Sequence, residues 1–447
     1  MHPESSTVRA VVLGDRYARR RELLNFGDGA MVEGYHHLLR EELGWTCAGT
    51  PWKPFPFLTF RRLRRASGAA GPEAVFERWF RQALRARPRR VRCEQRLLRA
   101  AAGATACCRP LAAGLEARCR ARLGLGLWEA LRPRLFRAAT AAAVLDTLRG
   151  ADLALFLGGG LMADHLARYA PSFLFEVYLA RRLGLRVAAV SESVSVTTPL
   201  LRRAVGAVYG GVELHLAREP LSRDALLALG VPAERIAVAP DFAFAAPTPP
   251  AARTGASRLV LLVIRGDRPL CLPAWRAVAR RLRERGREAR WAATCPVQDR
   301  GAGAALERHC GVAPLTGVGD YGAFLRALND CEALITDRFH AAIFALKMGT
   351  ALLPVRANTF KLDGLLRGTG YPLPVQPVLD EATCPALLAA LDRLLQDSSA
   401  HAAAAAAAGR VLTERLRQTV PPLLRELAAA GRPAAHHAVA QAPAGGE

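Results

Sequence analysis

Two side chains suited to chemistry lie close together in the stretch 333–349. Residues 333–336 are apolar or β-branched and predict a buried strand, and apolar residues at helical spacing follow until Gly349. Arg338 and His340 lie between them, where the strand ends and the helix begins. Ligands of open α/β sheets bind at such junctions, and free N–H groups at the helix start favour anions.

These residue types predict an anion site that can also move a proton. The guanidinium of Arg338 fits phosphate or carboxylate, and the imidazole of His340 exchanges a proton near neutral pH. The alternative is a structural pair that bonds nearby carbonyl groups. Asp337, which precedes both, is expected either to orient His340 or to cap the following helix.

The composition indicates a globular protein of two or three domains. The chain has 447 residues, of which 51% are hydrophobic. Apolar runs stay well short of the roughly 20 residues of a membrane-spanning helix, and the first residues do not resemble a signal peptide. We therefore expect a cytoplasmic protein. The 10 cysteines have no metal-binding spacing, so we expect reduced thiols, no metal and no cofactor.

Positive charge is concentrated in one part of the chain. The formal net charge is +23, and residues 53–149 hold 22 basic and 6 acidic side chains, an excess of 16 positive charges. Such a block suits a membrane surface, nucleic acid or an anionic substrate, and the alternative is a solvated, arginine-biased insertion. No nucleic-acid motif is visible in it, so we expect no nucleic acid. Peripheral contact with the inner membrane face through 53–149 stays open.

Alternating strand and helix patterns predict the fold class. Two such series indicate an α/β protein with two Rossmann-like domains, whose parallel sheets face a cleft. A stretch rich in Pro and Ala at 247–255 separates them. The expected parts are an N-terminal domain at 1–246 with a basic helical insertion at about 45–150, a C-terminal domain at 256–400, a helix at 401–430 and a disordered tail at 431–447.

Four sequence blocks resemble one known family. They are Asn25-Phe26-Gly27-Asp28, Gly158-Gly159-Gly160-Leu161, the segment 217–231 that begins Ala-Arg-Glu-Pro-Leu-Ser and precedes Pro240-Asp241, and the segment 337–345 that begins Asp-Arg-Phe-His-Ala. In this order they resemble the polysaccharide pyruvyl transferases. The resemblance implies a fold like that of GT-B glycosyltransferases. It also implies transfer of pyruvate from phosphoenolpyruvate to a sugar, commonly as a ketal across two hydroxyls.

The resemblance also implies roles for particular residues. Arg218 and Arg338 match the family's phosphoenolpyruvate-binding arginines, and His340 matches its catalytic histidine. Phe339 stands where the family usually has leucine, and we expect it to contact substrate. We expect His340 to act as the general acid that protonates the methylene carbon of the donor. For Arg218 the alternative is an ion pair with Glu219, Asp224 or Asp241.

Further residues are predicted to bind substrate. Asn25 and Asp28, in a loop before the helix at 30–42, are expected to bind acceptor hydroxyls, and the alternative is an Asx-type turn that starts the helix. Gly159 and Gly160 allow close approach of the backbone to a ligand. Lys361 is expected to reach a phosphate, and the alternative is an exposed lysine.

Two other function classes remain open at this stage. The first is a GT-B glycosyltransferase that uses a nucleotide sugar, although no convincing acidic residue for the ribose hydroxyls is visible in the second domain. The second is a non-catalytic binding protein that uses the basic block. The acceptor of a pyruvyl transferase would be a saccharide, and a lipid-linked glycan would explain the positive charge.

Overall fold

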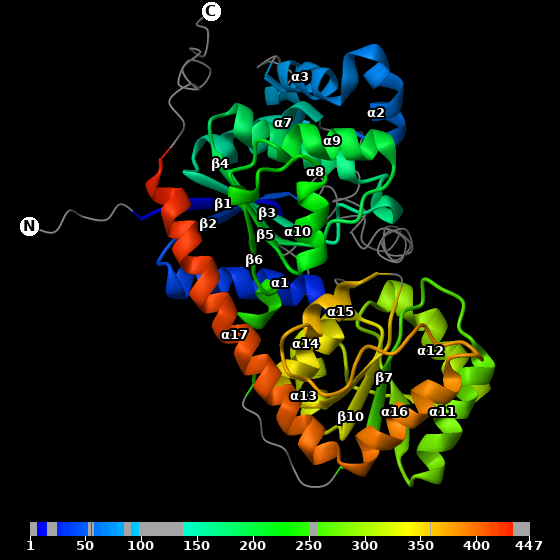
Figure 1. Ribbon diagram of the computed structural model, residues 1–447. Coiled ribbons are helices and arrows are strands. Elements are labelled where there is room, and N and C mark those ends of the chain that lie inside the picture. The colour runs from blue at the N-terminus through cyan, green and yellow to red at the C-terminus, as the bar shows by residue number, and fades with distance from the viewer. Residues whose placement is uncertain are drawn as a thin grey trace, which may run out of the picture. The chain divides into compact units, whose positions relative to one another are not determined.

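The computed structural model describes residues 7–15, 25–51, 55, 58–84, 91–97, 137–249, 257–357 and 359–431. These residues form two compact units, shown in Figure 1. Unit 1 comprises the described residues within 1–18, 38–239 and 419–447. Unit 2 comprises those within 19–37 and 240–418.

Unit 1 is built on a six-stranded parallel sheet with the order β2-β1-β3-β4-β5-β6. Its strands are β1 (Arg9–Asp15), β2 (Thr46–Pro51), β3 (Leu153–Gly159), β4 (Arg186–Glu192), β5 (Leu214–Ala217) and β6 (Ile236–Val238). Strand order reverses between β1 and β3. The carboxyl ends of these two strands therefore mark the place where a ligand of this sheet is expected.

Unit 1 also contains helices. The start of the stretch expected to be helical, at 45–150, forms a strand instead. The helices include α2 (Phe60–Ser67), α3 (Gly71–Leu84), α7 (Arg137–Arg149), α8 (Ala170–Arg182), α9 (Pro199–Tyr209) and α10 (Pro220–Leu227). The predicted helical insertion at 45–150 is wrong at its start, because β2 pairs with β1 there. β2 is an edge strand without large apolar side chains, which is why its sequence does not read as a strand. Residues 53–54, 56–57, 85–90 and 98–136 of the basic block lie outside the described residues.

Unit 2 has a five-stranded parallel sheet with the order β11-β10-β7-β8-β9. Its strands are β7 (Leu259–Val263), β8 (Glu288–Trp291), β9 (Ala313–Pro314), β10 (Ala333–Thr336) and β11 (Ala351–Pro354). Strand order reverses between β7 and β10. The Arg338–His340 segment directly follows β10 and so lies at this reversal. The two parallel sheets confirm the predicted α/β fold with two Rossmann-like domains.

The helices of unit 2 include one from far upstream in the chain. They are α1 (Phe26–His37), α11 (Leu272–Glu284), α12 (Pro296–Cys310), α13 (Tyr321–Asn329), α14 (Phe339–Met348), α15 (Lys361–Leu366) and α16 (Cys384–Gln396), with the 3-10 turn η5 (Phe242–Phe244). α1 contacts η5, α13 and α14. A Cβ at Gly34 would lie 1.8 Å from the carbonyl oxygen of Phe242, so only glycine allows this approach. The expected first domain, 1–246, therefore gives two segments to unit 2.

The long helix α17 (Ser398–Ala429) ends the described chain. It packs closely on α14, since a Cβ at Gly409 would lie 2.2 Å from the carbonyl oxygen of Leu346. None of the helices in the described ranges is both long and apolar enough to cross a membrane. Linker residues 250–256 and the tail at 432–447 lie outside the described residues.

Candidate functional site

His340 lies in the first turn of α14 and faces a buried carboxylate. Its Nε2 atom is 3.7 Å from Oδ2 of Asp241, whose side chain is fully buried. Asp241 is held in turn by η5, because the backbone N–H of Ala243 donates to its Oδ1 over 2.8 Å. Among the described residues Nε2 has no hydrogen-bond partner. The imidazole is thus held beside a carboxylate, with its Nε2 atom buried at that contact.

The other edge of the His340 ring lies against the start of α1. A Cβ at Gly27 would lie 2.0 Å from His340 Nδ1 and 2.1 Å from Cγ, so the ring occupies the space that a side chain would need. Asn25 shapes this turn, because its Oδ1 accepts a 3.0 Å hydrogen bond from the N–H of Gly27. This is the Asx-type turn given above as the alternative role for Asn25. α1 therefore starts at Phe26, earlier than expected, and Asp28 lies in its first turn.

Arg338 is buried, with 7% of its surface exposed, and its guanidinium lies at the amino end of α12. Nη1 and Nη2 each donate to Oε1 of Gln298 over 3.2 Å, and Nη2 also pairs with Asp299. The Nε atom is buried without a partner in the part of the chain that the structure describes. A buried N–H without a partner is costly, so Arg338 has one donor that a ligand can satisfy.

Carboxyl groups surround Arg338, and burial changes their acidity. Burial raises the pKa of Asp299, although Arg338 opposes this effect. Burial also raises the pKa of Asp337 to about 6. The Asp337 Oδ1 atom accepts a 2.8 Å hydrogen bond from the backbone N–H of Arg265, which follows β7. Both roles expected for Asp337 are therefore wrong, because it ties the end of β10 to the end of β7.

Phe339 and Lys361 complete the predicted residues of unit 2. The ring of Phe339 meets that of His340 edge-on, with 5.3 Å between the centroids. Lys361 is the first residue of α15, which contacts α14. Unit 2 thus brings the α1 turn directly against His340 and places Arg338 on the same β10–α14 junction.

Arg218 lies in unit 1, directly after β5, and reaches back toward β3. Its Nη2 atom donates to the carbonyl oxygen of Gly159 over 3.1 Å and to Ser193 Oγ over 2.8 Å, and its Nε donates to Ser193 over 3.2 Å. Ser191 has a positive φ of 52°, which turns the chain where β4 ends. Gly160 follows Gly159 in the turn after β3. Arg218 and the glycine turn therefore meet at the strand reversal of unit 1.

A buried polar network, absent from the sequence predictions, lies under this turn. Tyr209 donates to Glu192 Oε1 over 2.6 Å, and His215 Nδ1 lies 3.0 Å from Oε2 of the same carboxylate. The Glu192 side chain also explains why residue 158 is glycine, because a Cβ at Gly158 would lie 2.4 Å from Glu192 Cγ. The sequence signal for this network is a glutamate that ends a strand whose middle residues, 187–190, are apolar.

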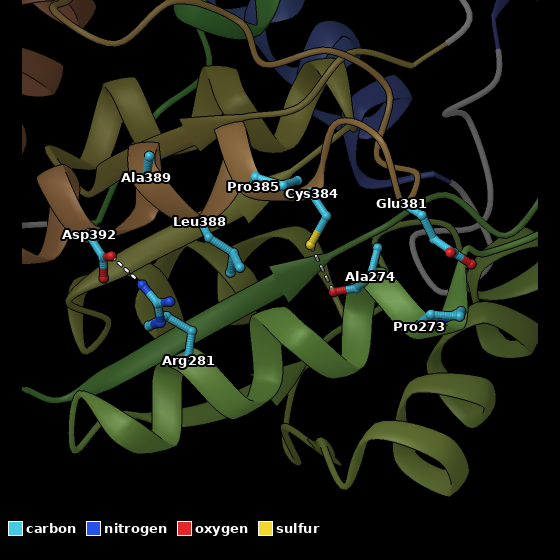
Figure 2. A pocket seen from close by; sticks show the side chains of 9 residues that line it. All are labelled: Pro273, Ala274, Arg281, Glu381, Cys384, Pro385, Leu388, Ala389 and Asp392. Carbon is cyan, nitrogen blue, oxygen red and sulfur yellow. Dashed lines mark hydrogen bonds and ion pairs between the residues drawn. The ribbon is translucent and has the colours of Figure 1, made fainter.

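A groove elsewhere in unit 2 contains none of the predicted site residues. It has a volume of about 480 Å³ and lies between α11 and α16. Figure 2 shows its lining, with the ion pair between Arg281 and Asp392 at one end. The Cys384 thiol lies 3.8 Å from the carbonyl oxygen of Ala274 and points into the helix packing. We therefore do not expect this groove to be the catalytic site.

Comparison with known proteins supports the sequence resemblance. A family model described as polysaccharide pyruvyl transferase matches residues 25–357. No curated protein matches the chain. Among solved structures, one from Listeria monocytogenes named for UDP-N-acetylglucosamine 2-epimerase has 13% identity over 94% of this chain and 98% of its own, with a TM-score of 0.51.

Two further structures are similar to a lower degree. Another UDP-N-acetylglucosamine 2-epimerase has 14% identity over 94% of this chain and 96% of its own, with a TM-score of 0.49. HepE from Anabaena, in complex with UDP-glucose, has 13% identity over 66% of this chain and 83% of its own, with a TM-score of 0.46. The similarity to the Listeria structure, at 13% identity, concerns the fold alone, which is GT-B-like.

Proposed function

The chain belongs to the polysaccharide pyruvyl transferase family and is a transferase, and from this we propose its reaction. It transfers pyruvate from phosphoenolpyruvate to hydroxyls of a saccharide acceptor and forms a ketal. His340 is the general acid, and Arg218 and Arg338 bind the donor. Asp28, Gly159, Gly160, Phe339 and Lys361 contribute to substrate binding, and Asn25 shapes the α1 turn that lies against His340. The reaction uses no cofactor.

The observation that supports this most directly is the placement of His340. A general acid needs a fixed orientation and a neighbouring group of negative charge that stabilises its protonated form. The Asp241 carboxylate, 3.7 Å from Nε2, supplies the partner, and Gly27 leaves the ring its space. A histidine with a purely structural role would have its ring nitrogens in hydrogen bonds, whereas His340 Nε2 has none within the described residues.

The proton transfers of the reaction balance with His340 as the single side chain that donates and regains a proton. His340 gives a proton to the methylene carbon of phosphoenolpyruvate, and C2 becomes electrophilic. One acceptor hydroxyl bonds to C2, and phosphate then leaves with the electron pair of the C–O bond. The second hydroxyl bonds to C2 and closes the ketal. Of the two hydroxyl protons released, one restores the histidine and the other leaves with phosphate.

The arginines suit a donor with a carboxylate and a phosphate. Burial of these charges needs compensating groups of opposite sign. Within the described residues the Nε–H of Arg338 has no partner, and the groups to which Arg218 donates include the Ser193 hydroxyl and the Gly159 carbonyl. Gln298 and Asp299 engage both Nη groups of Arg338, so its Nε–H is the donor that lacks a partner among the described residues.

The location of the protein in the cell is part of the proposal. We place it in the cytoplasm, with the basic residues at 53–149 in contact with an anionic membrane face that carries a lipid-linked acceptor. α2 supports this, because Arg61, Arg62, Arg64 and Arg65 are exposed while Leu63 is buried. Binding to vesicles that contain anionic lipid, compared with neutral vesicles, tests this part separately.

Turnover of a histidine variant tests the catalytic role. In His340→Gln we expect phosphate release from phosphoenolpyruvate, with a panel of saccharides, to fall by about 10²-fold or more. His309→Gln is the matched control, because His309 is exposed on α12 of the same unit. The product mass should rise by one pyruvyl ketal. Near-normal turnover of His340→Gln at saturating phosphoenolpyruvate would contradict the assignment.

Ligand binding separates this function from the alternatives. Phosphoenolpyruvate should raise the melting temperature of the wild type, and Arg218→Lys and Arg338→Lys should each weaken the effect, since lysine lacks the planar fork. Stabilisation by UDP-glucose without stabilisation by phosphoenolpyruvate would favour a nucleotide-sugar glycosyltransferase. A chain that binds neither, and releases no phosphate, would be a non-catalytic binding protein.

A further inference from the structure

A second basic pocket lies in unit 2, at the far end of α14 from His340. It has a volume of about 370 Å³ and lies between α14, the chain after η5 and α17. Four basic side chains line it: His37, Lys347, Arg410 and Arg417. The described residues that line it include no aspartate or glutamate. A concave site with this lining favours an anion.

Lys347 is held firmly at one wall of the pocket. Its Nζ donates to the carbonyl oxygens of Ala243 and Ala246 over 2.7 and 2.6 Å. An ammonium group has three donors, so one is left for a ligand. Burial lowers the pKa of Lys347 to about 7, while the carboxylates of Asp241 and Glu33 favour its charged form. A bound anion would add to their effect.

The opposite wall is formed by α17. Arg410 and Arg417 are seven residues apart and so project from the same face of the helix two turns apart. Gly409 lets α17 approach the α14 backbone, as the close contact with Leu346 shows. His37, the last residue of α1, closes a third side. Basic side chains therefore converge from three helices that are distant in sequence.

We propose that this pocket binds a phosphate group, either as inorganic phosphate or as part of a phosphorylated small molecule. The tetrahedral group has oxygens for donors from several directions, as this lining offers, whereas a planar carboxylate would meet fewer of them. The volume falls in the range of small-molecule sites and exceeds the needs of phosphate alone. None of the residues proposed for donor binding lines the pocket. The inference is therefore independent of the proposed function.

Variants on α17 test the pocket. Arg410→Gln removes an exposed lining residue, and Arg415→Gln, exposed on the same helix outside the lining, is the matched control. Binding is measured by calorimetric titration, with inorganic phosphate in one arm and a hexose 1-phosphate in another, at constant ionic strength. The Arg338→Gln background is used to weaken phosphate binding at the proposed donor site. We expect Arg410→Gln to raise Kd about tenfold or more and Arg415→Gln to leave it unchanged.

Lys347→Met provides a second test, and we expect it to weaken binding at least as much. Tighter binding of the hexose 1-phosphate than of inorganic phosphate would identify a phosphorylated metabolite as the ligand, and the reverse order would identify free phosphate. The inference is overturned if neither ligand binds at millimolar concentration. Equal effects of the Arg410 and Arg415 variants would also overturn it, since they would indicate general charge attraction.

Discussion

The substitution Gly27→Ala probes whether the α1 turn positions His340. The new Cβ would lie 2.0 Å from His340 Nδ1, against 3.4 Å for ordinary contact, so the ring or the turn must move by about 1.4 Å. Alanine favours a helix by about 0.5–1 kcal/mol over glycine. Overpacking costs about 1–3 kcal/mol. We therefore expect a net loss of stability of only about 1–2 kcal/mol, too small to unfold a typical protein.

The effect on turnover should be much larger than the effect on stability. A shift of this size would change the distance between His340 Nε2 and Asp241, now 3.7 Å, and would displace the proton donor from the substrate carbon. A misplacement of about 1 Å can cost about 10²-fold in rate. We expect kcat for phosphate release from phosphoenolpyruvate to fall by that factor, with unfolding by urea followed in parallel.

Gly29→Ala is the matched control for this experiment. Gly29 lies in the same helix, and a Cβ there would meet no atom within 4 Å. This variant should keep wild-type turnover and gain up to about 1 kcal/mol in stability. The reasoning is refuted if Gly27→Ala stays folded and turns over at the wild-type rate. The position of the His340 ring would then not depend on the absence of a side chain at residue 27.

Three further variants test other parts of the structure. Ser193→Ala removes two hydrogen bonds from Arg218 and should raise KM for phosphoenolpyruvate about tenfold with little change in kcat, measured by steady-state kinetics. The folded Asp337 has its pKa raised from 3.8 to about 6 and so holds its proton more tightly than the unfolded chain. Stability relative to Asp337→Asn should therefore fall by about 2 kcal/mol as pH rises from 4 to 6, measured by urea unfolding. Lys347 has its pKa lowered from 10.5 to about 7, so the unfolded chain binds more protons between these values. Stability relative to Lys347→Met should rise over that pH interval, and a flat difference would refute the assigned burial effect.

Most strands of both sheets were predictable because their side chains are buried on both faces. Runs such as residues 153–157 and 259–263 are almost purely apolar, which is typical of strands in parallel sheets. β2 was not predictable, since an edge strand needs few large apolar residues. The β10–α14 junction was correctly located because a buried strand, polar residues and a helix follow one another directly.

The partners of the predicted site residues were not predictable from local patterns. Asp241 is 99 positions before His340, and only folding brings the carboxylate to the ring. Gln298 and Asp299 lie in a stretch without a recognisable motif, so the sequence does not identify them as the hydrogen-bond and ion-pair partners of Arg338. Ser222 lies inside α10, where its hydroxyl donates to the Glu219 carboxylate. Roles that depend on distant contacts therefore needed the structure.

The membership of α1 in unit 2 has a consequence for how the chain is made. α1 ends at His37, and the η5 segment that it packs against begins at Phe242, about 200 residues later. At roughly 5–20 residues per second, the ribosome needs about 10–40 s to deliver that surface. During this interval the side chains of α1 that are buried in the native protein, among them Phe26, Met31 and Tyr35, lack the residues against which they pack. A fragment that begins after the linker would lack the same helix and would leave His340 without the wall that holds its ring.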